Sequence, residues 1–413
     1  MSNISLQDCL QLDQQDPLAF LRNEFQLPTD VINMDGNSLG ALPKNTLQKM
    51  KVTMEEEWGN GLIRSWSEAG WFESPQRVGD KIAPLIGARK GEVLVADTTS
   101  VNLFKALTAA IQLNVTRKVL LSETDNFPTD LYLMQGISAF TQHQIHAKIV
   151  SPEDLLDALQ EDVAVLLLTQ VNYKTAHIKD MAAITKAAHE KGILTVWDLS
   201  HSVGSIEVDL EAAQVDFAVG CGYKFLNGGP GAPAFIYVAK RHQEKAQNIL
   251  SGWMGHRDPF AFTTNYEPAP SIERFRCGTP VILGMAGLES GVDVFQKTSM
   301  QQLRQKAIQL SELFIQLMDQ ACSEYGFQLA SPRNAEQRGG HVSYHHTEGH
   351  AIYQAIKRQG IISDFRTPDI LRFGITPMYL RFVDIYQVVM AIKKVMATND
   401  WDKAEYKIRA AIT

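Results

Sequence analysis

Short apolar runs rich in β-branched residues recur along the first two thirds of the chain. Such runs, bounded by turn signals, are typical of strands that are buried on both faces. Segments with helical spacing separate most of them. This alternation predicts a largely parallel sheet covered by helices on both faces. The predicted strands span residues 93–96, 119–121, 163–169, 193–197, 217–219 and 234–238.

Two predicted helix ends in this region carry capping signals. Residues 151–154, Ser-Pro-Glu-Asp, combine a capping hydroxyl, a proline at the first helical position and acids in the first turn, so a helix is expected to begin there. Lys191 and Gly192 predict a basic last turn followed by a left-handed glycine.

The pattern changes after about residue 290. It predicts a long helix near residues 301–322, strands near 327–330 and 341–345, a helix near 349–358, a strand near 371–375 and a final helix from Ile385. This order predicts a separate α+β unit. We therefore expect a large α/β domain over residues 46–285, a smaller domain over 286–413, and an N-terminal segment, 1–45, that packs with the smaller domain.

Composition and charge restrict the partners. The 413 residues are 45% hydrophobic, and 39 basic against 46 acidic residues give a formal net charge of −7, as in a soluble globular protein. The absence of a basic excess argues against nucleic acid or anionic lipid as a partner. The longest apolar run, residues 163–168, is far shorter than the roughly 20 residues that cross a bilayer. The first residues carry acids where a signal peptide is basic and apolar, so we expect a cytoplasmic protein.

The segments around residues 197–201 and 220–231 carry the most informative chemistry. Asp198 ends a predicted strand, and the carboxyl ends of strands border the ligand crevice of an open α/β sheet. Lys224 follows another strand, with Tyr223 before it and a glycine-rich turn after it. An amine and a carboxylate facing one pocket favour pyridoxal phosphate, which a lysine binds covalently while an aspartate keeps the pyridine nitrogen protonated. Taken alone, each residue is more commonly a cap or a solvated surface group.

The phosphate and the ring of such a cofactor also need partners. Residues 97–102, Asp-Thr-Thr-Ser-Val-Asn, follow one predicted strand and open a helical stretch, so their hydroxyl and backbone N–H groups would form an anion site. An ordinary helix cap is the alternative. Phe127 follows the next strand and could stack on a pyridine face, although it would serve equally well as core filler.

Seven phrases in this order closely resemble kynureninases: MDGNSLGALP, DTTSVNLFKAL, DNFPTDLY, WDLSHSVG, CGYKFLNGGPGAP, SGWMGH and RCGTP. The resemblance begins near residue 30, continues to the C-terminus and is to bacterial members. It implies fold type I, the aspartate aminotransferase fold, with a mainly parallel seven-stranded type of sheet. It also implies a pyridoxal-phosphate-dependent hydrolase that cleaves the Cβ–Cγ bond of L-kynurenine to give anthranilate and L-alanine. 3-Hydroxykynurenine would be a poorer substrate.

The same resemblance implies roles for individual residues. Lys224, Tyr223 and Asp198 match catalytic positions. Arg372 matches the arginine that holds the substrate α-carboxylate, an assignment suited to a guanidinium fork. Trp253 and Thr279 match residues that reach the phosphate from a neighbouring subunit, which implies a homodimer. Further cofactor contacts are implied for Thr99, Ser100, Phe127, Asp130, Thr169 and His201, and substrate contacts for Trp66, Asn37 and Ser38. Trp66 would serve equally well as a packing residue.

Several alternatives compete with this interpretation. The histidines at 341, 345, 346 and 350 include pairs at metal-ligand spacing, but a strand there would separate the imidazoles, so we expect no metal. No G-x-G-x-x-G follows a strand, which argues against a nicotinamide dehydrogenase. A cysteine desulfurase needs a reactive thiol, whereas Cys322 lies in a helical pattern that predicts burial. Another lyase or aminotransferase of the same fold, and a non-catalytic protein that binds the cofactor, remain open.

Overall fold

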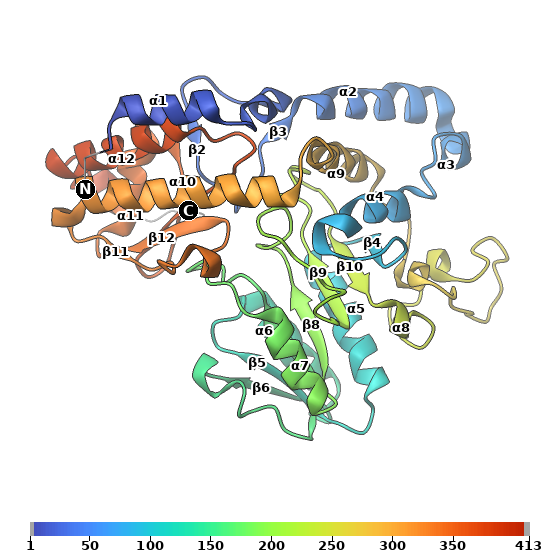
Figure 1. Cartoon of the computed structure of the whole chain (residues 1–413). Helices are drawn as coiled ribbons and strands as arrows, with labels where there is room; N and C mark the ends of the chain where they lie inside the picture. Colours follow the sequence, from blue (N-terminus) through green and yellow to red (C-terminus); the bar gives the residue numbers. More distant parts are fainter. Residues whose placement is uncertain (1–3, 409–413) are drawn as a thin grey trace.

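The computed structural model describes residues 4–408 and consists of two units built around two sheets (Figure 1). The larger sheet has seven strands in the order β4-β10-β9-β8-β7-β5-β6. Its pairings make β10 the one antiparallel strand of this sheet, and the other six run parallel to one another. The strands are β4 Val93–Val95, β5 Val119–Glu123, β6 His146–Val150, β7 Val163–Thr169, β8 Leu194–Asp198, β9 Phe217–Gly220 and β10 Phe235–Val238.

Helices cover both faces of this sheet, as the sequence predicted. Successive strand residues alternate between two apolar cores. Leu120 and Leu167 belong to one core, and Leu121 and Leu168 to the other. The covering helices include α4 Ser74–Ile82, α5 Thr99–Leu113, α6 Pro128–Phe140, α7 Met181–Glu190 and α9 Ile282–Phe295. The expected fold class is confirmed in its main features.

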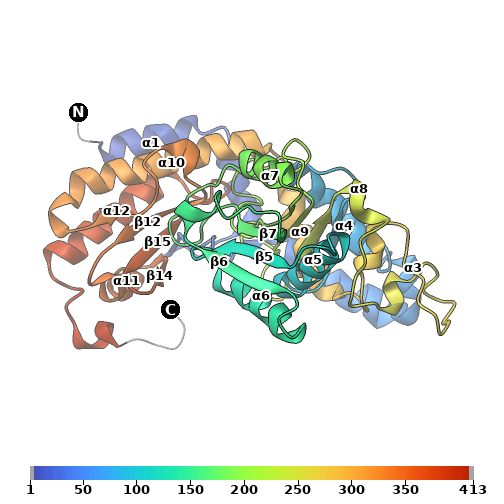
Figure 2. The ribbon, with the colours of Figure 1, turned by 90° about the horizontal axis from the view of Figure 1, so that it is seen from below.

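The C-terminal unit is a four-stranded antiparallel sheet with helices on one face. Its strands are β11 Gln328–Leu329, β12 His341–His345, β14 Asp364–Arg366 and β15 Ile370–Gly374, in the order β11-β12-β15-β14. Helices α10 Met300–Ala321, α11 Gly349–Arg358 and α12 Phe382–Ala397 complete the unit. Figure 2 shows it next to the large sheet.

Period-two alternation gives the smaller sheet one apolar and one polar face. Val342, Leu371 and Phe373 join the apolar core, where Phe373 contacts Phe314 of α10 at 4.9 Å between ring centroids. Arg372 alternates with these residues and therefore points to the opposite face. That second face also carries His341 and Ser343 of β12 and Asp364 and Arg366 of β14.

The N-terminal segment runs along both units. Helix α1 Leu6–Gln15 packs on α12, and β2 Ile32–Asn33 pairs with β13 Ile361–Ile362. After β3 Leu42–Pro43, which pairs with β1 Phe25–Gln26, helix α2 Lys44–Val52 packs on α9. Two short helices, α3 Ser65–Glu68 and α8 Lys240–Gln243, complete the set. The domain division after residues 45 and 285 stays a prediction.

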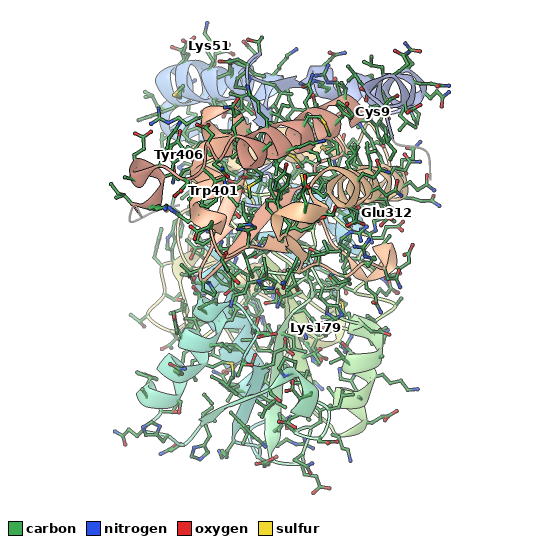
Figure 3. The ribbon with its side chains drawn as sticks, turned by 90° about the vertical axis from the view of Figure 1, so that its left-hand side faces the viewer. Cys9, Lys51, Lys179, Glu312, Trp401 and Tyr406 are labelled. Atoms are coloured by element: carbon green, nitrogen blue, oxygen red, sulfur yellow. The ribbon has the colours of Figure 1, made fainter. Side chains whose placement is uncertain are left out.

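The two units also meet at the segment after β7. His177 forms an isolated bridge with Arg338, and Ile178 N donates to Gln337 O over 2.9 Å. In Figure 3, Lys179 lies where the lower unit meets the upper one. Among residues 4–408, no helix has both the length and the apolar character needed to cross a membrane.

One local prediction failed, one strand was missed and one prediction is confirmed. The helix expected to begin at Ser151 is a single 3-10 turn, Pro152–Asp154; the Ser151 hydroxyl donates to Asp154 and accepts no backbone N–H group as a cap. Strand β6 was not predicted, because it is a partly exposed edge strand with little apolar patterning. Gly192 has φ of +70° and follows the last turn of α7, as predicted.

Candidate active site

A cavity of about 200 Å³ opens where the strands of the large sheet end. Thr169 and Asp198, the last residues of β7 and β8, lie opposite each other in the strand register. Helices α5 and α6 begin at the same edge, because parallel strands end together and their connections start there. The cavity is lined by Thr99, Ser100, Phe127, Thr129, Asp130, Thr169, Tyr173, Asp198, Ser200, His201, Tyr223 and Lys224.

The amine of Lys224 is held against an imidazole and two aromatic rings. Its Nζ lies 3.0 Å from Nε2 of His201. Burial, and then the positive charge of Lys224, lower the pKa of His201 well below its usual value, so the ring is neutral and Nε2 can accept this hydrogen bond. The same Nζ lies 6.0 Å from the ring centroid of Phe127 and 5.8 Å from that of Tyr223. The amine therefore faces the cavity in one defined position.

Two buried carboxyl groups share the cavity with this amine. The backbone N–H of Ser200 donates to Oδ1 of Asp198 over 2.7 Å, which partly offsets the rise in the pKa of Asp198 caused by burial. Burial, and then the charge of Asp198, raise the pKa of Asp130 well above its usual value. Oδ2 of Asp130 finds no hydrogen-bond partner within residues 4–408. A further cationic group in this space would favour the charged forms of both acids.

Pyridoxal phosphate fits this set of donors and acceptors. A protonated pyridine nitrogen is a suitable cationic partner for the buried Asp198. Thr99 and Ser100 open α5, whose first-turn N–H groups and positive dipole end favour a phosphate. Nδ1 of His201 is buried and has no partner in the described part of the chain, so a polar group is available on the cavity wall. Phe127, at the start of α6, supplies an aromatic face.

Three predicted substrate residues, Asn37, Ser38 and Arg372, belong to the N-terminal segment and the smaller sheet. None of them lines the cavity, but their segments contact residues that do. Gly40 N donates to Tyr223 O over 2.9 Å, and a Cβ at Gly40 would lie 2.3 Å from Lys224 O, so only glycine lets these segments approach. Asn37 is fully buried, and both its amide atoms lack partners among the described residues. Arg372 is buried too, and its Nη1 donates to the carbonyl of Tyr173, a residue of the cavity wall.

Comparison with known proteins decides the family. A kynureninase from Pseudomonas fluorescens is 47% identical over 411 residues, which cover 98% of this chain and 99% of that protein. The chain belongs to the kynureninase family. A kynureninase from Burkholderia pseudomallei (strain 1106a) is 46% identical over 412 residues, with the same coverage. The family model of the kynureninase C-terminal domain matches residues 303–392.

Solved structures agree on the fold. An apo cysteine desulfurase from Thermococcus onnurineus NA1 has a TM-score of 0.78 at 18% identity, covering 96% of this chain and all of that one. A cystine C–S lyase complexed with its product, cysteine persulfide, has a TM-score of 0.77 at 17% identity, covering 88% and 98% of the two chains. At such identities the likeness shows the fold alone. Both support the expected fold type I for this kynureninase relative.

Trp66, Trp253 and Thr279 also lie outside the cavity of their own chain. Trp66, on α3, contacts Trp71 edge-on at 5.8 Å between ring centroids. Trp253 packs against Phe260 and Phe262 in an exposed aromatic loop. Thr279 lines a separate small cavity of about 50 Å³. None of these three residues is among the residues that line the cavity of Lys224.

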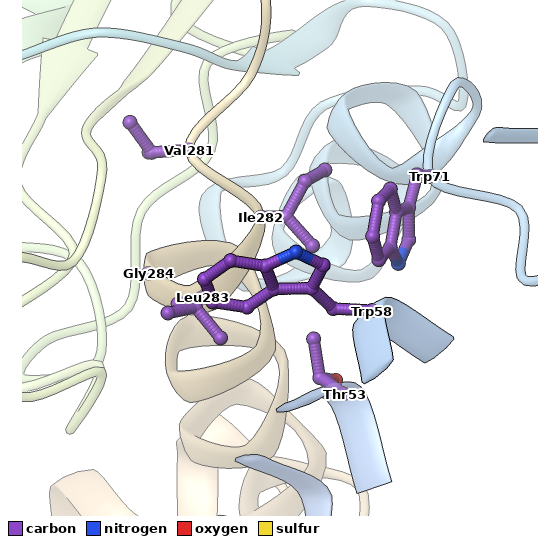
Figure 4. A pocket seen from close by; sticks show the side chains of 7 residues that line it. All are labelled: Thr53, Trp58, Trp71, Val281, Ile282, Leu283 and Gly284. Carbon is purple, nitrogen blue, oxygen red and sulfur yellow. The ribbon is translucent and has the colours of Figure 1, made fainter. Parts of the chain in front are cut away.

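A second, apolar cavity of about 360 Å³ lies between the segment after α2 and the start of α9. Its wall is formed by Thr53, Trp58, Trp71 and residues 281–284, none of which is titratable. Figure 4 shows the Trp58 ring between Leu283 and Trp71. Trp58 is 60% exposed. This cavity lacks groups for covalent or acid–base chemistry, so its size does not make it the reaction site.

The histidines of the C-terminal unit do not converge on a metal. His345 Nδ1 lies 3.1 Å from Asp369, His346 Nε2 pairs with Tyr325 O, and His341 packs against His201. No group of three or more potential metal ligands occurs within the part of the chain that the structure describes.

Cys322 is buried, as the sequence predicted, and burial raises the pKa of its thiol to about 12. A desulfurase nucleophile needs a reactive thiolate, so this environment does not suit that role.

Several wall residues escaped the sequence prediction. Ser200 and Thr129 lie within two of the family motifs, each two residues from a predicted site residue, Asp198 or Phe127. Closeness in sequence to those residues is the signal that could have identified them. Tyr173 follows β7, and its ring contacts Phe127 edge-on at 5.1 Å between centroids. The carboxyl-end rule that selected Asp198 therefore also points to Tyr173.

Proposed function

We propose that the protein hydrolyses L-kynurenine to anthranilate and L-alanine with pyridoxal phosphate bound in the cavity of Lys224. The observation that carries this proposal is the convergence of Lys224, Asp198 and a neutral His201 at the strand ends of a kynureninase-family chain. The bound cofactor supplies an electron sink for the bonds around the substrate α-carbon. Release of anthranilate from L-kynurenine by the purified protein tests the proposal.

Side chains of the protein perform the other steps of binding and proton transfer. Lys224, once free of the cofactor, is the base for the α-proton, because its Nζ lies inside the cavity. Asp198 would hold the proton on the pyridine nitrogen, and Thr99 and Ser100 would bind the phosphate. Arg372 would bind the substrate α-carboxylate. Cleavage also needs water to add to the γ-carbonyl and a proton donor during hydration and collapse.

Tyr223 is the proposed proton donor for that step. Its ring lies beside Lys224, and burial raises its pKa, so the phenol stays protonated at neutral pH. Tyr223→Phe removes this proton and is expected to lower kcat roughly a hundredfold, the order of one general acid. Steady-state release of anthranilate measures it, with the exposed Tyr132→Phe as matched control. A kcat within about twofold of the parent would remove Tyr223 from this role.

Preference for L-kynurenine over 3-hydroxykynurenine is proposed from the family resemblance at Trp66. Because Trp66 lies outside the cavity of its own chain, it would contact the substrate of a neighbouring subunit in the proposed dimer. An indole stacks on an anilide ring but offers little to an added hydroxyl group. We expect kcat/KM for L-kynurenine to exceed that for 3-hydroxykynurenine by about tenfold, the usual scale for such a difference in an apolar site. Parallel kinetics with both substrates measure the ratio. A preference for 3-hydroxykynurenine would contradict the role given to Trp66.

A homodimer with shared active sites accounts for the residues that lie outside their own cavity. Trp253 and its neighbours Phe260 and Phe262 are exposed, and Trp58 projects over an apolar cavity. Exposed apolar patches of this kind support a subunit contact. In the proposed dimer, Trp253 and Thr279 of one subunit face the cavity of the other.

Mixed dimers test this arrangement. Lys224→Ala and Trp253→Ala subunits, each deficient alone, are expected to regain about a quarter of parental activity when equal amounts are unfolded and refolded together, since half of the dimers are mixed and one site of each is intact. Anthranilate release measures the recovery, and each variant refolded alone is the control. No recovery from subunits that do form mixed dimers would contradict sharing of the site.

A further inference from the structure

Most N–H groups of Arg372 already donate hydrogen bonds to groups of its own chain. Nε donates to Oδ1 of Asp364 over 2.7 Å, and Nη2 donates to Oδ2 of Asp364 and, over 3.2 Å, to Oγ of Ser38. Nη1 donates to Tyr173 O. A guanidinium has five N–H groups, so at most one is left. A bidentate grip on another carboxylate requires two parallel N–H groups, and Arg372 offers them only if Asp364 moves.

Asp364 occupies the place that a ligand carboxylate would take. It lies directly across from Arg372 in the pairing of β14 with β15, and its side chain is only 3% exposed. Ser38 Oγ donates to its Oδ2 over 2.7 Å. Burial would raise the pKa of Asp364, but the hydrogen bonds and charge of Arg372, with the charge of Arg366, hold that pKa at about 2. At neutral pH, Asp364 is therefore a charged carboxylate that competes with a ligand carboxylate for Arg372.

Arg366 is a second guanidinium within reach of the same carboxylate. It follows Asp364 by two residues on β14, so both side chains lie on the polar face of the sheet. Its Nη2 lies 3.0 Å from Oδ2 of Asp364, and its side chain is 34% exposed. Its one hydrogen bond within the described residues is a weak one, from Nη1 to Phe365 O over 3.4 Å. Arg366 thus has N–H groups to spare for Asp364.

We propose that Asp364 binds the guanidinium of Arg372 in the free enzyme and that the α-carboxylate of the substrate displaces Asp364 from it. The displaced Asp364 carboxylate then pairs with Arg366. This inference rests on the proposed function in assigning the α-carboxylate to Arg372. The exchange avoids leaving a buried charge unpaired, because each carboxylate keeps a guanidinium throughout. It also makes the site selective, since a ligand without a carboxylate cannot release Arg372 from Asp364.

Binding of L-alanine and of L-alaninamide to the cofactor-loaded enzyme, measured by calorimetric titration, tests this exchange. In Asp364→Asn, an amide replaces the competing charge, so L-alanine is expected to bind about fivefold to tenfold more tightly while L-alaninamide binds unchanged. In Arg366→Gln, the displaced Asp364 loses its second partner, and L-alanine is expected to bind about fivefold more weakly. In the double variant, Arg366→Gln should have no further effect.

Weaker or unchanged binding of L-alanine by Asp364→Asn would overturn the inference. An equal effect of Arg366→Gln in both backgrounds would also do so, because it would mean that Arg366 contacts the ligand itself. If Asp364→Asn does not fold, Arg366→Gln decides alone: the inference fails unless binding of L-alanine weakens and binding of L-alaninamide does not. Anthranilate release by the parent is assayed separately. If release is absent while the exchange pattern holds, only the proposed function fails.

Discussion

Replacement of Lys224 by alanine is expected to lower anthranilate release by at least about a thousandfold, because one amine serves as cofactor attachment and as base. Among residues 4–408, Lys224 supplies the one ammonium group on the cavity wall. Its neighbour His201 is neutral and already contacts it over 3.0 Å. No other lining side chain combines attachment with proton removal at the α-carbon. The loss should appear in kcat, measured by anthranilate fluorescence at saturating L-kynurenine.

A second readout separates this role from a loss of structure. After dialysis of the loaded protein, the parent should keep the absorbance of covalently held cofactor, and Lys224→Ala should lose it. The matched control is Lys240→Ala, because Lys240 is exposed at the start of α8 and is not among the residues that line the cavity. Residual turnover within about tenfold of the parent in Lys224→Ala would contradict the assignment.

Asp198→Asn is expected to lower kcat/KM by about a hundredfold or more, the scale found when a positioned electrostatic partner is removed. Asparagine keeps the oxygen that accepts from Ser200 N, so the turn after β8 can persist. It loses the charge that would keep the pyridine nitrogen protonated. The effect is therefore electrostatic, and the cofactor should also dissociate more readily from the variant.

Asp180→Asn is the matched control for this substitution. Asp180 caps α7 by accepting from Ala183 N, and asparagine caps a helix about as well as aspartate. Its activity should equal that of the parent. If Asp198→Asn kept parental kcat/KM and cofactor affinity, the proposed contact between Asp198 and the pyridine ring would be wrong.

The large sheet and its ligand edge could be predicted because they depend on local pattern. Buried strands such as β7 and β8 read as continuous apolar runs, and Thr169 and Asp198 mark where they end. The rule that ligands bind at the carboxyl ends of parallel strands selected Asp198, whereas Thr169 was named from the family resemblance. The family phrases added Asn37, Ser38 and Arg372, which composition and spacing alone do not select.

The missed features depend on contacts between distant segments. Asp364 and Arg366 were not singled out, because their importance comes from the register that sets Asp364 opposite Arg372. The antiparallel direction of β10 follows from its pairing with β4 and β9, which no local pattern specifies.

The most direct test of the central claim is the reaction itself. L-Kynurenine is added to the purified protein loaded with pyridoxal phosphate, and anthranilate is followed by fluorescence while L-alanine is quantified. We expect repeated turnover with anthranilate and L-alanine in equal amounts. A loaded, folded protein that releases neither product from L-kynurenine would contradict the account.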